Sequence, residues 1–261
     1  MSDTLIHSHF DGTTGLGRIV FGRPEAMNAL NQPMADAFRT AVQDITAREG
    51  LRAIHISAQG KAFAAGGDIS TFADPAKAPD AIDDLLGAIN PAVLALARCP
   101  VPVVTAVQGA AAGAGFALAL VGDFVLASEK AMFAVAYTKL GGSPDGGLTH
   151  ALARRVGPAR ALELLMAGAV LSAQEAVELG VASRLLPAEG FDQAALDFTL
   201  SLAAGPTLSF GSCKALLAEP MSLSDQLDAE QEGFTTIAQS RDFAEGVSAF
   251  VERRTPKFIG R

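Results

Sequence analysis

The sequence has few of the residues that build disulfide frameworks or metal sites. It contains two cysteines, Cys99 and Cys213, far apart in apolar, helix-like surroundings, and four histidines in all. Two isolated cysteines favour buried, inert thiols over a disulfide or a zinc site. Of the histidines, only His7 and His9 lie close together, and they alternate along an expected strand rather than at a metal-ligand spacing. We therefore expect no metal site.

The sequence also lacks a surplus of positive charge. Its 20 Lys and Arg against 28 Asp and Glu give a net charge of −8 at pH 7. This balance argues against a nucleic-acid surface, which would need a basic patch. It does not exclude an anionic small molecule, because such binding depends on local charge. The N-terminal residues MSDTLIHSHF lack a basic region followed by an apolar core, so they show no secretion signal and we expect a cytoplasmic protein.

A run without charged residues, from Val101 to Gly122, is long enough to be considered as a membrane-spanning segment. However, Pro102, Gln108 and three glycines interrupt it, and no basic flank marks a cytoplasmic side. With 261 residues, of which 49% are hydrophobic and 18% charged, the chain is large enough for one substantial globular core. We therefore expect no membrane segment.

The same run, extended to Asp123, is VPVVTAVQGAAAGAGFALALVGD, and the chain is organised around it. Its β-branched start predicts a strand buried on both faces, and its alanine- and leucine-rich end predicts a helix. The glycine-alanine turn at residues 109–115 lets a ligand approach the backbone, and a helix start offers unpaired N–H groups to negative charge. Close helix–strand packing without function is the alternative. A dinucleotide loop would need a third glycine in place of Leu118, and a phosphate loop needs a Gly-Lys-Ser/Thr sequence that is absent.

Two other segments place small residues between a strand and a helix. Residues 61–70, KAFAAGGDIS, have a glycine pair followed by Asp68, which is suited to cap a helix from Ile69. A plain loop is the alternative there. Residues 140–147, LGGSPDGG, contain a Pro-Asp-Gly turn. By composition alone, Asp145 in this turn is either a functional carboxylate or a turn residue.

The remaining elements follow from periodicity and turn signals. Residues 1–187 alternate strands and helices in strand–strand–helix units, and residues 188–261 are helical. A capping box at Ser172 and Glu175 opens one helix, and Pro91 is expected to kink or divide another. We expect strands at residues 4–10, 16–22 (joined by a turn at 11–12), 53–57, 124–127, 132–135 and 181–186, and helices from residue 31, over 82–98, 148–156 and 158–167, and from 191 onward.

Together these segments resemble the enoyl-CoA hydratase/isomerase, or crotonase, superfamily over nearly the whole chain. The segments that carry the resemblance are GRPEAMNAL (22–30), KAFAAGGDI (61–69), the 102–123 run, EKAMFAVAYTKLGGSPDGG (129–147), LSAQEAVELGVASRLLP (171–187) and FAEGVSAFVERR (243–254). In motif the chain is most similar to the enoyl-CoA isomerases of phenylacetate breakdown.

The resemblance implies an α/β fold, with a crotonase-like spiral of ββα repeats in residues 1–187 that holds the active site. The C-terminal helices of residues 188–261 would join subunits into a homotrimer or a dimer of trimers. The implied substrate is an acyl-CoA thioester. Neither a metal nor a redox cofactor is implied, since coenzyme A is part of the substrate.

The resemblance also implies roles for single residues. When a proton is removed beside the thioester carbonyl, an enolate forms, and the N–H groups of Gly67 and Ala114 would hold its oxygen. Losing one such donor costs about 10²–10³ in rate. The other implied contacts are the main chain of Ala64 and Ala65 beside the adenine, Asp68 and Ile69 in the thioester channel, Arg23 and Lys61 at the phosphates, and Lys257 and Phe258 from a neighbouring subunit. For each of these cations, a solvated surface residue is the alternative.

The chain departs from the family's hydratases at both of their catalytic glutamates. Ala117 and Tyr137 stand at those positions, so ordinary addition of water is disfavoured. Asp145 remains, and in the isomerases that it resembles one acid takes a proton from C2 and returns it at C4. Such a base contributes about 10²–10⁴-fold and works best with a raised pKa, which apolar neighbours provide. Tyr137 either donates a hydrogen bond in the pocket or fills the volume of the missing glutamate.

The expected function is therefore an enoyl-CoA isomerase, with three alternatives left open. The first, a hydratase-like lyase, is disfavoured by the loss of both glutamates. The second, an acyl-CoA hydrolase or dehalogenase, would use Asp145 as a nucleophile with a histidine base, but no histidine lies between His55 and His150. The third is a subunit that binds acyl-CoA without chemistry.

Overall fold

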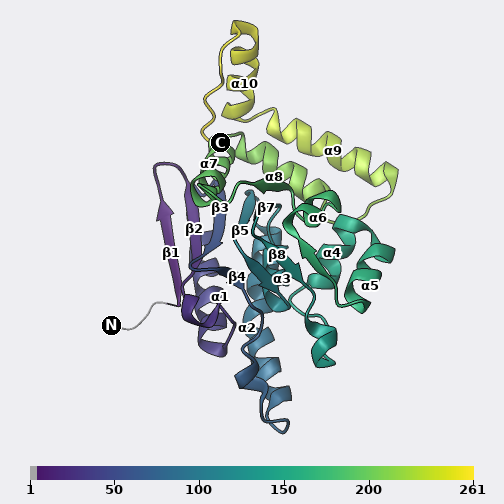
Figure 1. Ribbon diagram of the computed structural model, residues 1–261. Helices are drawn as coiled ribbons and strands as arrows, with labels where there is room; N and C mark the ends of the chain where they lie inside the picture. Colours follow the sequence, from purple (N-terminus) through teal and green to yellow (C-terminus); the bar gives the residue numbers. More distant parts are fainter. Residues whose placement is uncertain (1–4) are drawn as a thin grey trace.

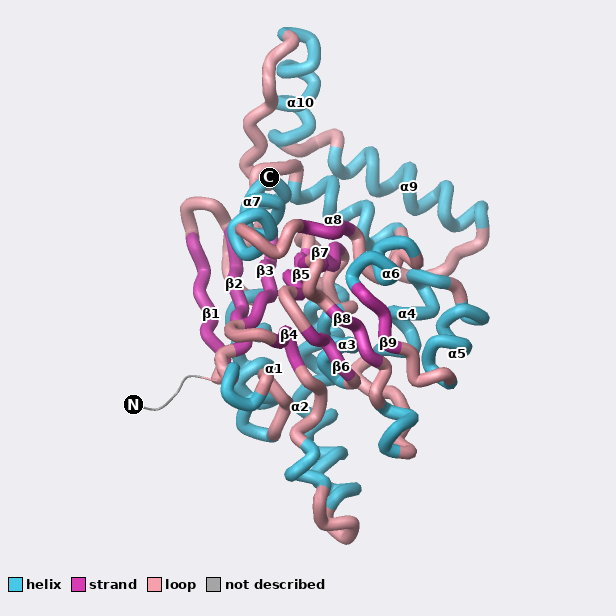
Figure 2. The backbone as a smooth tube through the Cα atoms, in the orientation of Figure 1, coloured by secondary structure: helices cyan, strands magenta, loops and turns pink. Residues whose placement is uncertain are grey.

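Two β-sheets form the centre of the molecule in the computed structural model, which describes residues 5–261 (Figures 1 and 2). The first sheet has the order β1-β2-β3-β5-β7-β10, in which β1 and β2 are antiparallel and the other neighbours parallel. Its strands are β1 (Ile6–Asp11), β2 (Leu16–Phe21), β3 (Ala53–Ala58), β5 (Val103–Val107), β7 (Phe124–Ser128) and β10 (Arg184–Leu186). Every residue of β5 is buried, as its β-branched sequence predicts.

The second sheet consists of β4 (Ala62–Ala64), β6 (Ala110–Ala112), β8 (Met132–Ala134) and β9 (Val170–Ser172), in that order. In this sheet, each of β4, β6 and β8 directly follows, in the chain, a central strand of the first sheet (β3, β5 and β7). Each central turn of the chain thus adds one strand to each sheet, which confirms the predicted spiral of ββα repeats. The prediction of a turn at residues 110–112 is wrong, and β4 and β9 are not predicted at all, because strands of three residues are too short to show clear alternation.

The N-terminal hairpin turns at the predicted place. The Gly15 N–H donates to the Asp11 carbonyl, and the Asp11 side chain accepts hydrogen bonds from the Thr13 N–H and the Thr14 hydroxyl. Gly15 has a φ of +71°, a conformation that suits glycine. Thr4, where the first strand was expected to begin, lies outside the described residues.

Two helices begin where the sequence predicts. The Asn31 side chain accepts a hydrogen bond from the Met34 N–H, and Ser172 and Glu175 form a complete capping box. The helices of this part are α1 (Gln32–Thr46), α2 (Ala78–Arg98), α3 (Ala114–Ala119), α4 (Leu148–Val156), α5 (Pro158–Met166) and α6 (Ala173–Glu178), with the short 3₁₀ turns η1 (Pro24–Ala26), η2 (Ile69–Phe72) and η3 (Tyr137–Leu140). α1 and α2 pack on each other, and their buried residues share one large core cluster with those of α3.

Pro91 does not divide α2, so that part of the prediction is wrong. The helix runs unbroken from Ala78 to Arg98 with Pro91 exposed inside it. The missing Pro91 N–H leaves the Gly87 carbonyl without its helical partner. Gly87 and Pro91 are both exposed, so water can donate to the Gly87 carbonyl in place of the missing N–H.

After β10 the helices α7 (Phe191–Ala203), α8 (Thr207–Leu216), α9 (Leu223–Ile237) and α10 (Arg241–Glu252) follow. α7 packs on the first sheet, where Phe191 and Ala195 share a small core cluster with Val104 and Leu126. α10 stands away from the sheets (Figure 1). The division into residues 1–187 and 188–261 stays a prediction. Within residues 5–261, no helix has the length and apolar character needed to cross a membrane.

The two cysteines differ in their surroundings. Cys99 is buried beyond the end of α2, whereas Cys213 is exposed on α8. The prediction of two buried thiols is therefore wrong for Cys213. An apolar neighbourhood in sequence buries a residue only where another element covers it, and this side of α8 is not covered.

Candidate active site

Two turns built from glycine and alanine residues meet at the ends of β4 and β6. Because these strands are parallel neighbours, the Gly66–Gly67 turn after β4 adjoins the Gly113–Ala114 turn after β6. A Cβ atom on Gly66 would lie 2.9 Å from the Ala112 carbonyl oxygen and 3.7 Å from the Ala114 nitrogen. Gly66 and Gly113 also have φ angles of +100° and +52°, which favour glycine. Tertiary packing thus brings the two predicted turns together.

The backbone N–H groups of Gly67 and Ala114 are not used inside the protein. Among the described residues, neither donates a hydrogen bond. Ala114 is the first residue of α3, and the N–H groups of a first helical turn have no partner within the helix. Gly67 lies opposite Leu30 in a parallel β-bridge. The two hydrogen bonds of this bridge run from the Leu30 N–H to the Gly66 carbonyl and from the Asp68 N–H to the Leu30 carbonyl, so the Gly67 N–H is not used.

A tyrosine–aspartate pair lies beside these turns. Tyr137, at the start of η3, is 8% exposed, and its Oη donates a hydrogen bond of 2.7 Å to Oδ1 of the half-buried Asp145. The Tyr137 Cζ atom lies 3.9 Å from the Cβ position of Gly113. Asp145 precedes α4, and its carbonyl accepts from the Leu148 N–H. The Tyr137 hydroxyl therefore donates a hydrogen bond in addition to filling volume.

The two acidic residues of the site segments have opposite electrostatic surroundings. Burial raises the pKa of Asp145, and the hydrogen bond from Tyr137 opposes part of that rise. In contrast, hydrogen bonds from Ser70 and Arg23 lower the pKa of Asp68. Burial also raises the pKa of Tyr137, with the Asp145 charge adding to it, so the phenol keeps its proton. Asp145 is thus the carboxyl group suited to exchange a proton.

The Ala117 side chain packs next to the backbone that follows Asp145. It is 2% exposed on α3, and a Cβ atom on Gly146 would lie 3.1 Å from the Ala117 Cβ. The resemblance places a hydratase glutamate at this position. Here a methyl group packs against the backbone next to Asp145, and it offers no second carboxylate.

The predicted binding residues before the first turn lie close to it. Ala64 is the buried last residue of β4, and the Ala65 N–H donates to the Met27 carbonyl. Asp68 caps η2, as predicted, and Ile69 is exposed. Arg23 lies 2.8 Å from the Asp68 carboxylate and also donates to the Ala29 carbonyl, so its charge is paired inside the chain. Lys61 is exposed.

The C-terminal tail is held elsewhere. The Lys257 N–H donates to Glu245, and the Phe258 carbonyl accepts from Arg52. Buried Asp242 accepts from the N–H groups of Ile259 and Gly260, which folds the tail back on α10. Within residues 5–261, no hydrogen bond or ion pair joins Lys257 or Phe258 to the two glycine turns. A single chain therefore does not bring these two residues to the site.

Asn28 is a supporting residue that sequence reasoning missed. It is fully buried with a φ of +54°, and its side chain donates to the Gln59 and Ala62 carbonyls and accepts from the Arg23 N–H. These contacts hold the loop that pairs with Gly67 through Leu30. The available signal was an asparagine beside a turn-forming Arg-Pro segment, since asparagine is among the few residues that adopt this conformation readily.

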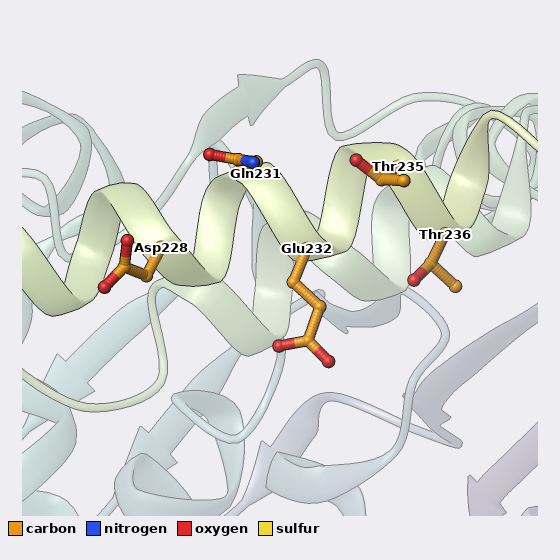
Figure 3. Close-up of a pocket in the computed structure, with 5 residues that line it drawn as sticks. All are labelled: Asp228, Gln231, Glu232, Thr235 and Thr236. Carbon is orange, nitrogen blue, oxygen red and sulfur yellow. The ribbon is translucent and has the colours of Figure 1, made fainter.

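A shallow depression on α9 is unrelated to this cluster. Its volume is about 360 Å³, and it is lined by Asp228, Gln231, Glu232, Thr235 and Thr236. Figure 3 shows that all five come from one helix. A single polar helix surface offers no convergent groups, so the two glycine turns with Tyr137 and Asp145 remain the candidate site.

Known proteins resemble the chain over nearly its full length. The sequence model of the family described as enoyl-CoA hydratase/isomerase matches residues 11–261. A Rhodobacter capsulatus protein named "Probable enoyl-CoA hydratase" is 37% identical over 256 residues, 97% of this chain and 97% of the relative. The 1,2-epoxyphenylacetyl-CoA isomerase of Escherichia coli is 37% identical over 261 residues, 98% of this chain and 99% of the relative.

A solved structure agrees with the fold. The crystal structure of an enoyl-CoA hydratase from Polaromonas sp. JS666 has a TM-score of 0.89 and 34% identity, and the match covers 97% of this chain and 98% of that one. The spiral of two sheets, the adjoining glycine turns and these similarities agree. The chain belongs to the enoyl-CoA hydratase/isomerase, or crotonase, superfamily.

Proposed function

We propose that this chain is an enoyl-CoA isomerase, which moves a double bond along the acyl group of a CoA thioester by proton transfer. One observation carries the proposal: Asp145 is half-buried, accepts a 2.7 Å hydrogen bond from Tyr137 at Oδ1, and has a pKa raised by burial. Such a carboxylate is suited to accept a proton and to return it. Ala117 stands where a hydratase of the family has a glutamate, which disfavours water addition.

In the proposed reaction, the N–H groups of Gly67 and Ala114 donate to the thioester oxygen. Asp145 removes a proton from C2 of a 3-enoyl thioester. The electron pair of the broken C–H bond forms a C1–C2 double bond, and the carbonyl π pair moves onto the oxygen, whose charge the two N–H groups stabilise. The π pair of the C3–C4 double bond then takes this proton from Asp145 to form the new C4–H bond, and the C1–C2 π pair moves between C2 and C3. The carbonyl re-forms and the double bond now joins C2 and C3, so that no atom is gained or lost.

Turnover of three thioesters tests the proposal. An isomerase converts 3-hexenoyl-CoA into a conjugated product whose absorbance rises, whereas a hydratase consumes the conjugation of crotonyl-CoA. We expect isomerisation of 3-hexenoyl-CoA without hydration of crotonyl-CoA. Turnover of an aromatic-ring thioester would test whether the chain acts on substrates of the phenylacetate-type isomerases. Hydration of crotonyl-CoA at a comparable rate would contradict the proposal. Tight binding of all three without turnover would favour the binding-subunit alternative.

We infer that Tyr137 positions Asp145 by holding Oδ1, which leaves Oδ2 for the substrate. Tyr137→Phe keeps the ring but removes the donor, so kcat/KM should fall by about tenfold at acidic pH, since hydrogen bonds to charged groups contribute about 1.5–3 kcal/mol. The reaction needs ionised Asp145, and the Tyr137 hydrogen bond lowers that pKa. Its loss should therefore move the acid limb of the pH–rate profile to higher pH. If the acid limb of the Tyr137→Phe profile lay at the wild-type pH, Tyr137 would only fill space and would not position Asp145.

We infer that the C-terminal helices join copies of this chain into a homotrimer or a dimer of trimers, as the resemblance implies. The support is apolar surface on α10, where Phe250 is 86% and Val251 75% exposed. Burial against another copy would remove this area from water. Light scattering after gel filtration should give three or six times the 26.8 kDa mass of one chain. A Phe250→Asp, Val251→Asp variant should shift that mass toward one chain, and a wild-type monomer would contradict the inference.

A further inference from the structure

A second cavity lies on the opposite face of the first sheet from the candidate active site. Along β3, Ile54 and Ile56 belong to the same core cluster as Ala114 and Tyr137. His55 points to the other face because side chains alternate along a strand. There it lines a cavity of about 690 Å³ together with residues of β2, the ends of β3, β5 and β7, and the start of α7. Ligands often bind beyond the carboxyl ends of parallel strands, and this volume suits a small molecule.

Arg18 is a cation without a partner in this cavity. It pairs with His55 across the parallel strands β2 and β3. Its guanidinium makes no hydrogen bond or ion pair with any residue of the described range 5–261, and its Nε is buried without a partner. An unpaired buried donor costs folding free energy. A protein tolerates such a loss of folding free energy at a functional site, where a bound ligand can supply the missing acceptor.

His55 offers a lone pair next to this cation. It is 3% exposed, and its Nδ1 lies 2.8 Å from the Thr199 Oγ1. The Thr199 hydroxyl already donates to the Ala195 carbonyl, so its oxygen accepts a hydrogen bond from the His55 Nδ1–H. Burial, with the Arg18 charge adding to it, lowers the pKa of His55 to about 4. The imidazole is therefore neutral near pH 7, and its Nε2 is an acceptor without a hydrogen-bond partner among the described residues.

The start of α7 completes the polar wall. Gly190 caps this 13-residue helix without a side-chain hydrogen bond, and its first N–H groups border the cavity. These groups favour an anion. Lys130 adds a second positive charge, while Asp192 is the one carboxylate among the lining residues. The cavity thus offers two cations and free N–H groups to an anion, and a lone pair to a hydroxyl.

We propose that this cavity binds a phosphate monoester, with the phosphate held by Arg18, Lys130 and the first turn of α7, and with a ligand hydroxyl donating to the His55 Nε2. The site is separate from the thioester chemistry, because the first sheet lies between them. Phosphate in its protonated forms carries both anionic oxygens and an O–H, which matches this combination of groups. Sulfate at neutral pH has no O–H to donate.

Calorimetry and thermal unfolding with inorganic phosphate, glycerol phosphate and sulfate test the proposal on the full chain. We expect saturable binding at millimolar phosphate, tighter binding of glycerol phosphate, weaker binding of sulfate, and a melting temperature that rises with phosphate concentration. Arg18→Met should weaken phosphate binding tenfold or more, because a charge-assisted contact is lost. Without phosphate, Arg18→Met should melt at the same or a higher temperature, since the buried unpaired Nε is removed.

Arg48→Met is the matched control, because Arg48 is exposed just after the end of α1 and lines no part of the cavity. It should leave phosphate binding unchanged. Phosphate binding that Arg18→Met does not weaken, or no saturable binding at all, would overturn the proposal. Displacement of phosphate by dephospho-coenzyme A, which carries no phosphate monoester, would also overturn it, because the phosphate would then occupy the thioester channel. None of these readouts depends on the proposed isomerase activity.

Discussion

Replacing Asp145 by asparagine is expected to slow the isomerisation of 3-hexenoyl-CoA by about 10²–10⁴-fold, because an amide cannot accept and return the proton. The amide has nearly the shape of the carboxylate, and its oxygen can still accept the Tyr137 hydrogen bond. Thioester binding should therefore change little, and the loss should appear in kcat rather than KM. Initial rates from the absorbance of the conjugated product give both constants.

The same variant should remain folded. Burial raises the pKa of Asp145, so the stability that this group contributes is present at low pH and is lost as the pH rises through the folded-state pKa. Asparagine stays neutral and avoids that loss, so the melting temperature at pH 7 should match or exceed that of the wild type. Asp44→Asn, at an exposed position of α1, is the control and should keep the wild-type rate. A fully active Asp145→Asn enzyme would refute the assignment.

Replacing Ala114 by proline is expected to lower kcat by about 10²–10³-fold, the effect of losing one oxyanion donor. Proline has no N–H, and its ring would occupy the direction from which the Ala114 N–H approaches the thioester oxygen. Ala114 is the first residue of α3, a position where proline fits the helix and where the N–H has no helical partner. The backbone donor can thus be removed by an ordinary substitution.

Ala114→Gly is the matched control, because it keeps the N–H and removes only a methyl group. It should retain most of the wild-type kcat. Far-ultraviolet circular dichroism and the melting temperature should show that both variants fold. If Ala114→Pro isomerised 3-hexenoyl-CoA at the rate of Ala114→Gly, the enolate would not be held at this turn.

The outline of the fold follows from local signals. The β-branched run of β5 predicted a buried strand, and Asn31 and Ser172 predicted helix starts that the structure confirms. These features depend on contacts within a few residues, so the sequence contains them directly. β4, β6 and β9 were missed because these three-residue strands depend on pairing with neighbours that are distant in the chain.

The candidate site shows the same contrast at the level of single residues. By composition, Asp145 was either a turn residue or a functional carboxylate, and Tyr137 either a donor or a filler. The hydrogen bond between them decides the question for Tyr137. Neither the partnership of Arg18 and His55 nor the cavity beside them was visible in the sequence, because their register is set by the pairing of β2 with β3.

By itself, the sequence determined that the chain has two turns of glycine and alanine residues and a single acidic residue in the SPDGG segment, since residue identity acts locally. Only the tertiary structure decided that the turns meet, because this requires the parallel pairing of β4 with β6. It also decided that Asp145 has a raised pKa and Asp68 a lowered one. Burial and hydrogen-bond partners set a pKa, and both arise only when distant segments pack together.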